Sequence, residues 1–334
     1  MPSCPRAGPC RPSSARPVAG QPTIARCLTD PPADPTPCGR RCVGVRALLL
    51  DLDGVIVVAG EAVPGAAAAI GELGRRGTPY RIVTNTSAVS RATLSRWAAK
   101  LGAAIPPERF QSALSASAAW AARVLPGQPL YVLASEDART EFAGQHLLTH
   151  EAAGARGARA AAVIVGDSPE EATFDNLNRA FRLVLAGAQL VGMHRNPWWL
   201  TAEGPTLDPG AFVAGLEFSA EVRARIIGKP APAFFSLAIG DLRREVGRDL
   251  ARRDVAIVGD DVRTDVLAAQ RAGLRGIFVL SGKHGPADAD AAATERSGRR
   301  PDAIALPDRS RRRARLKGHP TDPPLARGTA HHDD

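Results

Sequence analysis

The sequence predicts an α/β fold: a doubly wound parallel sheet with a second, smaller α/β domain inserted into it. Short apolar runs alternate with helix-like stretches along residues 45–306, which is the pattern of repeated βα units. Several of these runs end in acidic or hydroxyl residues, at the positions where open parallel sheets bind their ligands. A smaller set of βα units occupies 126–218 before the larger pattern resumes, so we expect the larger domain to be discontinuous.

The length, composition and charge of the chain set limits on its class. It has 334 residues, of which 44% are hydrophobic, enough for two domains or for one domain with an insertion. Many of the arginines behind the net charge of +9 lie at 309–317, beyond the last core-like segment. A basic run in that place is usually a solvated tail, so we do not expect a nucleic-acid partner. No apolar run is long enough to cross a membrane, and we expect a soluble, cytoplasmic protein.

Both ends of the chain are expected to be disordered. Residues 1–42 are rich in Pro, Arg and Ser, lack periodicity and hold all five cysteines. These cysteines lack the paired spacing and the histidines of a zinc site, and the absence of a secretory apolar region argues against a disulfide framework. Translation from Val43 or Val45, which would omit this extension, is an alternative that the sequence leaves open. The basic segment 309–334 is expected to be a disordered tail.

The first part of the larger domain, 43–125, begins with the run 45–50, which is polar only at Arg46. Such a run predicts a strand buried on both faces, as in a parallel sheet. Pro64 in a first helical turn and Gly77 after a last turn mark the ends of a helix. The other elements expected in this part are a loop at 55–61, helices at 64–76, 91–101 and 115–124, and strands at 80–83 and 110–111.

The inserted domain, 126–218, and the second part of the larger domain, 219–308, continue the alternation. The insertion is predicted to hold strands at 130–133, 161–165 and 189–191 and a helix at 170–186. The second part is predicted to hold helices at 233–246 and 264–270, strands at 254–258 and 276–280, and an edge element at 301–306.

Four groups of polar residues follow apolar runs or stand in loops punctuated by Gly or Pro. Each group alone is also compatible with ordinary turn chemistry. Because the carboxyl ends of strands in a doubly wound sheet converge on one crevice, we expect the groups to meet there. The groups are Asp51 with Asp53, Thr84 with Asn85, Lys229, and Asp260 with Asp261 and Asp265.

Two carboxylates at the end of a buried strand, Asp51 and Asp53, need compensation, which a divalent cation with a phosphate would supply. A carboxylate can attack phosphorus and form an aspartyl phosphate, a role that suits Asp51. Mg²⁺ prefers one or two protein carboxylates plus waters, and Asp51 and Asp260 can supply these carboxylates. Asp53 would then protonate the leaving group and later activate water.

The remaining polar groups suit the phosphate itself. The hydroxyl of Thr84 and the amide of Asn85 can hold phosphate oxygens, and the ammonium of Lys229 can neutralise the remaining charge. Together the four groups predict phosphoryl transfer assisted by Mg²⁺.

These motifs, in this order along residues 45–306, resemble those of the haloacid dehalogenase (HAD) superfamily of aspartate-based phosphatases. They are Asp51-Leu52-Asp53-Gly54, Thr84-Asn85, Gly228-Lys229-Pro230, and Gly259-Asp260-Asp261 with Asp265. The run 84–87 and the insertion that precedes Lys229 look like subfamily IIA, the NagD-like branch with a large α/β cap. Segments 194–196, 209–213, 216–217 and 282–283 are similar to the phospholysine phosphohistidine inorganic pyrophosphate phosphatase-like group.

The resemblance implies a Rossmann-like HAD core with an inserted cap, dependence on Mg²⁺, an aspartyl-phosphate intermediate and, often, a homodimer formed through the cap. It implies that Asp51 is the nucleophile and a metal ligand, and that Asp53 is the acid/base, with its backbone carbonyl on the metal. The other roles that it implies are phosphate binding by Thr84, Asn85 and Lys229, metal binding by Asp260, and a metal-bound water held by Asp261 or Asp265.

Our leading hypothesis is a Mg²⁺-dependent phosphatase for a small phosphorylated metabolite, which the sequence does not identify further. A phosphotransferase or mutase is an alternative, although small-capped relatives usually fill that role. A non-enzymatic, receiver-like phosphoacceptor domain is another. Against it, Asp51 and Asp53 share one strand end, whereas a receiver places its acid pair and its acceptor on separate strands.

Other residues with chemical potential are expected to be structural. His194 could contact a substrate, but packing or capping near a cap strand is the simpler expectation. The aromatic pair Trp198 and Trp199 more often packs than forms a substrate wall. Asp137 and Asp167 fit helix caps or turns.

Overall fold

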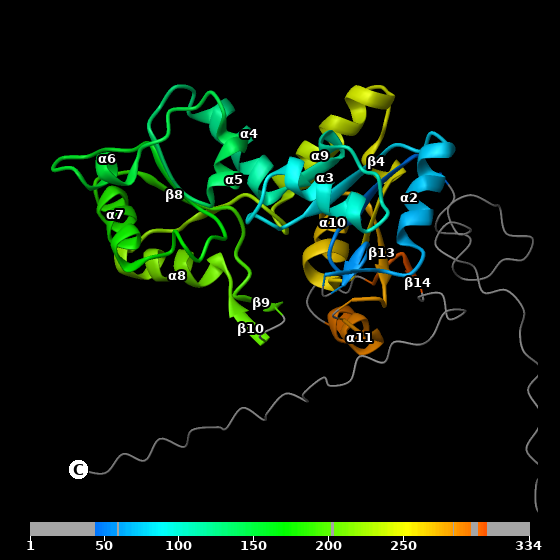
Figure 1. The fold of residues 1–334 in the computed structure, drawn as a ribbon. Helices are drawn as coiled ribbons and strands as arrows, with labels where there is room; N and C mark the ends of the chain where they lie inside the picture. The colour runs from blue at the N-terminus through cyan, green and yellow to red at the C-terminus, as the bar shows by residue number, and fades with distance from the viewer. Residues whose placement is uncertain (1–43, 59, 202–203, 283, 295–299, 306–334) are drawn as a thin grey trace, which may run out of the picture.

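The computed structural model describes residues 44–58, 60–201, 204–282, 284–294 and 300–305. These residues form two lobes, each built on its own sheet (Figure 1). The large lobe holds a six-stranded sheet in the order β14-β13-β12-β1-β4-β5, and every neighbouring pair is parallel. Its strands are β1 (Ala47–Asp51), β4 (Tyr80–Thr84), β5 (Phe110–Ser112), β12 (Val255–Gly259), β13 (Arg275–Val279) and β14 (Ala303–Ala305). The predicted doubly wound parallel sheet is confirmed, including the edge element expected at 301–306.

Strand β1 lies at the centre of this sheet, between β12 and β4, and all five of its residues are buried. Its side chains alternate between the two faces, as the pleat of a strand requires. Ala47 and Leu49 belong to the core cluster on one face, and Leu48 and Leu50 to the cluster on the other. The continuous apolar run is therefore explained by helices that cover both faces of the sheet.

The helices of the large lobe divide between these two faces. Helices α9 (Pro232–Val246) and α10 (Ala268–Arg271) contribute to one core cluster, and α2 (Ala66–Arg75) and α3 (Arg91–Lys100) to the other. Helix α4 (Ala113–Val124) follows β5 and lies in the small lobe (Figure 1), where its buried residues share the first cluster with cap strands. A π-helical turn, Val262–Leu267, leads into α10. Side-chain caps fix several of the helix starts: Ser90 accepts from the Thr93 amide before α3, and Ser112 forms a capping box before α4.

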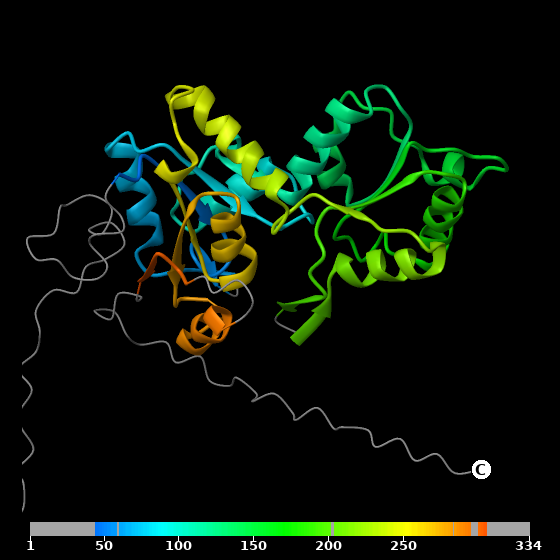
Figure 2. The same ribbon diagram turned by 180° about the vertical axis from the view of Figure 1, so that it is seen from behind.

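The small lobe is the inserted cap. Its four-stranded parallel sheet has the order β11-β8-β7-β6, with strands β6 (Leu130–Leu133), β7 (Ala162–Val165), β8 (Gln189–Gly192) and β11 (Arg225–Ile226). Its helices are α5 (Glu136–Arg139), α6 (His150–Gly154), α7 (Phe174–Leu185) and α8 (Pro209–Ala220). Because β11 pairs with β8, we propose that the cap ends at 226 rather than at the expected 218. Figure 2 shows the chain after β11 crossing from the small lobe to α9.

Several elements differ from the sequence-based expectation. The helix expected at 170–186 begins at Phe174, because the Thr173 side chain caps it by accepting from the Asn176 amide. The expected loop at 55–61 contains a short hairpin, β2 (Val57–Val58) with β3 (Glu61–Ala62). Elements that the sequence did not predict include the short strand β11, the hairpin of β9 (Trp198–Thr201) with β10 (Gly204–Leu207), helix α8, and helix α11 (Pro286–Thr294).

The two terminal segments that were expected to be disordered, 1–42 and 309–334, lie outside the described residues, as do all five cysteines. Within the described part of the chain, no helix combines the length and the apolar character that a membrane crossing demands.

Candidate active site

The carboxyl ends of β1, β4 and β12 bring the predicted residues into one buried centre. Asp51 ends β1, Thr84 ends β4, and Asp260 follows β12 directly. Lys229 enters from the chain that returns from the cap, and its Nζ lies 2.7 Å from Oδ1 of Asp51 and 2.6 Å from Oδ1 of Asp265. All five side chains are buried.

Lys229 is held as a cation by these contacts. Its ammonium also donates to the backbone carbonyl of Val83, at 3.4 Å. Burial on its own lowers the pKa of a lysine, but the carboxylates of Asp265 and Asp51 outweigh it and hold the pKa of Lys229 above its usual value. A fixed positive charge therefore stands beside the carboxylate of Asp51.

Three buried carboxylates, those of Asp51, Asp260 and Asp265, face one another with ligand oxygens within 4.8 Å. Burial, opposed by Lys229 and reinforced by the charges of Asp53 and Asp260, raises the pKa of Asp51 to about 6. Burial and the charge of Asp51, opposed by Lys229, raise the pKa of Asp265 to about 7. One lysine does not balance this acidic cluster. Hard oxygen ligands in such a cluster fit a divalent cation such as Mg²⁺.

Two glycines beside this cluster, Gly54 and Gly282, leave room for the Asp260 side chain. A Cβ atom at Gly54 or at Gly282 would overlap the carboxylate of Asp260. Gly54 also has a φ of +74°, a left-handed conformation that glycine adopts readily, and its carbonyl accepts a hydrogen bond from the Ser281 hydroxyl. The glycine of the Asp-Leu-Asp-Gly motif is thus required by the close approach of β1 and β12.

Asp261 and Asp265 have different places. Oδ1 of Asp261 accepts from the amides of Arg263 (2.8 Å) and Thr264 (2.9 Å), so this carboxylate caps the following turn. Asp265 reaches the carboxylate cluster instead, and its Oδ2 accepts from the Asp261 amide at 3.3 Å. Asp53 differs again, because it is exposed while Asp51 beside it is buried.

The amide of Asn85 positions Lys229. Oδ1 of Asn85 accepts from the Lys229 amide at 2.8 Å, and its Nδ2 donates to the Lys229 carbonyl at 3.0 Å. A Cβ atom at Gly228 would lie 2.6 Å from the same Oδ1, so the glycine of the Gly-Lys-Pro motif makes this clamp possible. Thr84 Oγ1 accepts from the Thr86 amide at 3.1 Å and donates to the Thr86 hydroxyl at 3.2 Å.

Ser87 joins this loop to the cap, a contact that the sequence analysis missed. Its Oγ accepts from the Asp167 amide at 2.9 Å and lies 3.1 Å from Nε2 of His194. Nδ1 of His194 lies 3.8 Å from Asp208. The only signal in the sequence was the position of Ser87 in the run that begins at Thr84.

Replacing His194 by glutamine is expected to reduce acid destabilisation. Burial lowers the pKa of His194 to about 4, so the unfolded chain binds a proton that the folded protein excludes. The stability lost to this group therefore grows as pH falls from about 6.5 toward about 4. His194→Gln can keep a hydrogen bond to Ser87. In this variant, the decrease in the free energy of unfolding between about pH 7 and about pH 4.5 should be about 2 kcal/mol smaller than in wild type.

Urea unfolding at both pH values measures this effect. His146→Gln, at an exposed position of the cap, is the matched control and should leave the loss unchanged. An equal loss in His194→Gln and wild type would contradict a neutral, buried His194.

Two family models match the chain, one over the first part of the large lobe and the start of the cap, the other over the second part of the large lobe. The description "Haloacid dehalogenase-like hydrolase" matches residues 48–147, and a HAD-hydrolase-like model matches 226–306. Among curated proteins, the chain is 35% identical over 248 residues to haloacid dehalogenase-like hydrolase domain-containing protein 2 of Rattus norvegicus, covering 73% of this chain and 87% of the relative. It is 30% identical over 260 residues to the human phospholysine phosphohistidine inorganic pyrophosphate phosphatase, covering 75% and 89%.

Solved structures agree with these relatives. NagD from E. coli K-12 superposes with a TM-score of 0.68 at 26% identity, covering 79% of this chain and 97% of that one. A glycerol phosphate phosphatase from Mycobacterium tuberculosis, in complex with magnesium, superposes with a TM-score of 0.68 at 27% identity, covering 79% and 75%. With its motifs gathered at the carboxyl edge of the sheet, the chain belongs to subfamily IIA of the haloacid dehalogenase superfamily and is a phosphatase of that family.

Proposed function

We propose that this phosphatase hydrolyses a small phosphorylated metabolite in a Mg²⁺-dependent reaction, through a phosphoaspartate formed on Asp51. One observation carries the proposal: the Asp51 carboxylate lies 2.7 Å from the Lys229 ammonium, inside a cluster with Asp260 and Asp265. A nucleophilic carboxylate, a neutralising cation and further oxygen ligands are what phosphoryl transfer to an aspartate needs.

In the first half-reaction, a carboxylate oxygen of Asp51 attacks phosphorus and the ester bond to the leaving oxygen breaks. Asp53 donates a proton to that oxygen, so the leaving group departs as a neutral alcohol. Lys229 neutralises charge on the phosphoryl oxygens, and Thr84 and Asn85 bind the phosphate from the end of β4. The clamp of Asn85 on the Lys229 backbone keeps the ammonium in place during this step.

In the second half-reaction, Asp53 takes a proton from a water molecule, which attacks the phosphorus of the phosphoaspartate. The bond between phosphorus and Asp51 breaks, inorganic phosphate leaves and the carboxylate is restored. Asp51, Asp260 and the backbone carbonyl of Asp53 would hold Mg²⁺, and we propose Asp265, rather than the helix-capping Asp261, as the group that holds a metal-bound water. The ion supplies positive charge that offsets repulsion between carboxylate and phosphate.

The relatives support a small substrate. One neighbour is named a glycerol phosphate phosphatase and was solved with magnesium, and one relative is named for phospholysine, phosphohistidine and inorganic pyrophosphate. The cap contacts the loop that follows β4 and is suited to exclude water and to select the leaving group. Phosphotransfer to a second metabolite and a receiver-like role stay alternatives, and release of inorganic phosphate from a panel of phosphorylated metabolites separates them from hydrolysis.

Removal of divalent metal is expected to stop phosphate release, and added Mg²⁺ to restore it, because the acidic cluster cannot accept an anionic phosphate unaided. In Asp260→Asn the Mg²⁺ concentration for half-maximal rate should rise at least about tenfold. Phosphate release from p-nitrophenyl phosphate during Mg²⁺ titration of chelator-treated protein measures both effects.

The matched control for this titration is Asp290→Asn, the same change at an exposed position of α11. Its titration should overlay that of wild type. Full activity in chelator, or an unshifted titration of Asp260→Asn, would contradict the assigned metal site.

A cytoplasmic location and a homodimer formed through the cap stay predictions. On the helix pair α7 and α8, Phe174 is 80% exposed and Phe218 is 87% exposed. A second cap would cover apolar side chains of this kind.

A further inference from the structure

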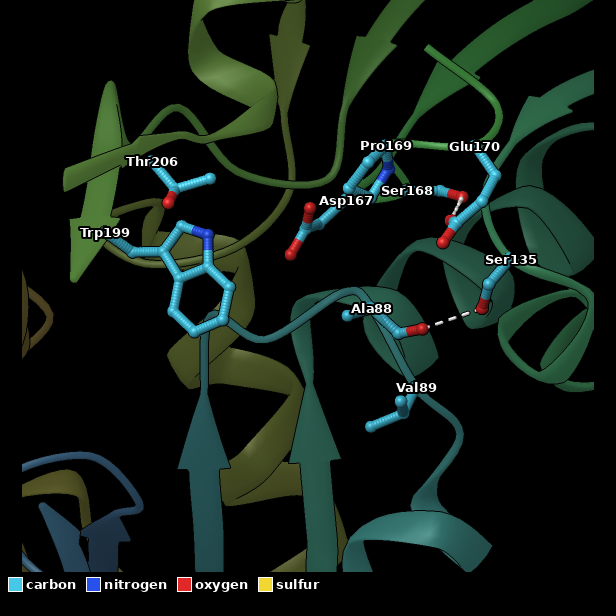
Figure 3. A pocket seen from close by; sticks show the side chains of 9 residues that line it. All are labelled: Ala88, Val89, Ser135, Asp167, Ser168, Pro169, Glu170, Trp199 and Thr206. Atoms are coloured by element: carbon cyan, nitrogen blue, oxygen red, sulfur yellow. Dashed lines mark hydrogen bonds between the residues drawn. The ribbon is translucent and has the colours of Figure 1, made fainter. Parts of the chain in front are cut away.

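A cavity of about 300 Å³ lies where the cap meets the large lobe. The large lobe contributes the loop after β4, at Ala88 and Val89, and the β9–β10 hairpin contributes Trp199 and Thr206. The remaining wall is a cap loop that follows β7 and includes Asp167 and Glu170, with Ser135 nearby (Figure 3). The cavity is therefore built from both lobes and is large enough for a leaving group of several atoms.

Hydrogen bonds tie this cavity to the loop that binds phosphate in the proposed reaction. The Asp167 amide donates to Ser87 Oγ at 2.9 Å, and the Ser135 hydroxyl donates to the Ala88 carbonyl at 2.7 Å. Ser87 and Ala88 continue the loop that starts at Thr84 and Asn85. Nδ2 of Asn85 also donates to Oδ1 of Asn196, just before the hairpin, at 3.4 Å. The cavity therefore adjoins the same loop that carries Thr84 and Asn85.

The walls of the cavity are acidic. Among the described residues that line it, Asp167 and Glu170 are the charged ones, and none is Lys, Arg or His. Glu170 accepts from the Ser168 hydroxyl at 3.2 Å, whereas no described group donates a hydrogen bond to the carboxylate of Asp167. Within the described residues, the Asp167 carboxylate therefore does not act as a helix cap, although the residue lies in a bend before a turn. Its carboxylate and the indole of Trp199 are directed toward the same space (Figure 3).

These walls discriminate between leaving groups. An anionic leaving group would meet two carboxylates without a compensating cation, and an uncharged alkyl group would leave Asp167 without an ion pair as water is excluded. A protonated amine would pair with Asp167 and Glu170 and could stack on the face of Trp199 through a cation–π contact. The acidic lining contrasts with the chain as a whole, whose net charge is +9.

We propose that this cavity binds a leaving group that carries a protonated amine, so that the substrate is a phosphate monoester of an amino alcohol. The proposal rests on the phosphatase function proposed above and adds its substrate class. Asp167 and Glu170 pair with the ammonium while the ester oxygen, protonated by Asp53, separates from phosphorus. The amine keeps its own proton throughout, and the products are inorganic phosphate and the amino alcohol.

The test compares kcat/KM for short ω-aminoalkyl phosphates with kcat/KM for alkyl phosphates of the same length, using the full chain with Mg²⁺. In wild type, the ratio of amine to alkyl ester should reach about tenfold at the chain length that matches the cavity. In Asp167→Asn and in Glu170→Gln the ratio should fall toward one. The matched control is Glu151→Gln, an acid-to-amide change at an exposed position of α6, and it should keep the wild-type ratio.

Each outcome separates this proposal from the one on which it rests. If p-nitrophenyl phosphate is hydrolysed but the wild-type ratio stays at or below one at every length, the amine proposal is wrong and the phosphatase proposal stands. A high ratio that both variants retain would place the amine elsewhere. No phosphate release from any ester would overturn the phosphatase function itself. Thermal unfolding of each variant identifies misfolding, and either acid variant alone is sufficient for the comparison.

Discussion

Asp51→Asn is expected to lower phosphate release from p-nitrophenyl phosphate by at least about four orders of magnitude. An amide oxygen is a poor nucleophile toward phosphorus, and the change also removes one oxygen ligand from the cluster with Asp260 and Asp265. Steady-state phosphate release at saturating Mg²⁺ measures the effect, and acid quenching of wild type during turnover should trap a phosphorylated protein that the variant does not form.

The fold should survive this substitution. Asparagine is nearly isosteric with aspartate, and the Lys229 ammonium keeps its contact with Asp265 at 2.6 Å. Asp290→Asn repeats the chemical change at an exposed site and should keep full turnover. Turnover of folded Asp51→Asn within about tenfold of wild type would contradict the assignment of Asp51 as the nucleophile.

Lys229→Met is expected to lower the free energy of unfolding by about 3 kcal/mol in metal-free protein near pH 8, because it leaves two buried carboxylates without their cation. The carboxyls of Asp51 and Asp265 have pKa values raised to about 6 and about 7. Folded protein thus holds protons that the unfolded chain releases above about pH 4, so their contribution to stability declines as pH rises toward about 7. Without the charge of Lys229, the free energy of unfolding falls more steeply as pH rises. The destabilisation of Lys229→Met should therefore be smaller near pH 5 than near pH 8.

Urea unfolding in chelator at the two pH values measures this difference. Lys100→Met, at the exposed end of α3, makes the same change where no buried carboxylate depends on it, and should be near neutral. A loss in Lys229→Met that is equal at both pH values would argue against a lysine that balances ionised carboxylates. Activity gives a second reading, because the variant should also lose most phosphate release.

The central strand and the reaction centre could be predicted from sequence because their signals are local. The run that became β1 is apolar at nearly every position, which few structures other than a sheet covered on both faces require. Asp51 and Asp260 each stand at the end of such a run, and the geometry of parallel sheets brings those ends together. Lys229 follows only the two-residue strand β11, so its place was predicted from the Gly-Lys-Pro loop and the chemistry of its ammonium rather than from a strand signal.

The parts that could not be predicted depend on contacts distant in sequence. Asp261 and Asp265 lie in one short segment, and only the turn that Asp261 caps decides which of them faces the cluster. Helix α8 has no amphipathic pattern, and its buried Gly210 packs against the backbone of residues 195–196. The sequence suggested a cap or turn at Asp167. Its place in a cavity could not be predicted, because segments distant in sequence and from both lobes build that cavity.

The segment through which the chain returns from the cap to the core is held by hydrogen bonds at nearly every residue. The cap sheet stays hydrogen-bonded along this strand through Gly228, whose amide donates to the Met193 carbonyl at 2.7 Å. The next residue, Lys229, is already clamped on both sides of its backbone by Asn85. Any rotation of the cap relative to the core would therefore be confined, on this side, to the link between Gly228 and Lys229, and it would leave the active-site ammonium anchored to the core.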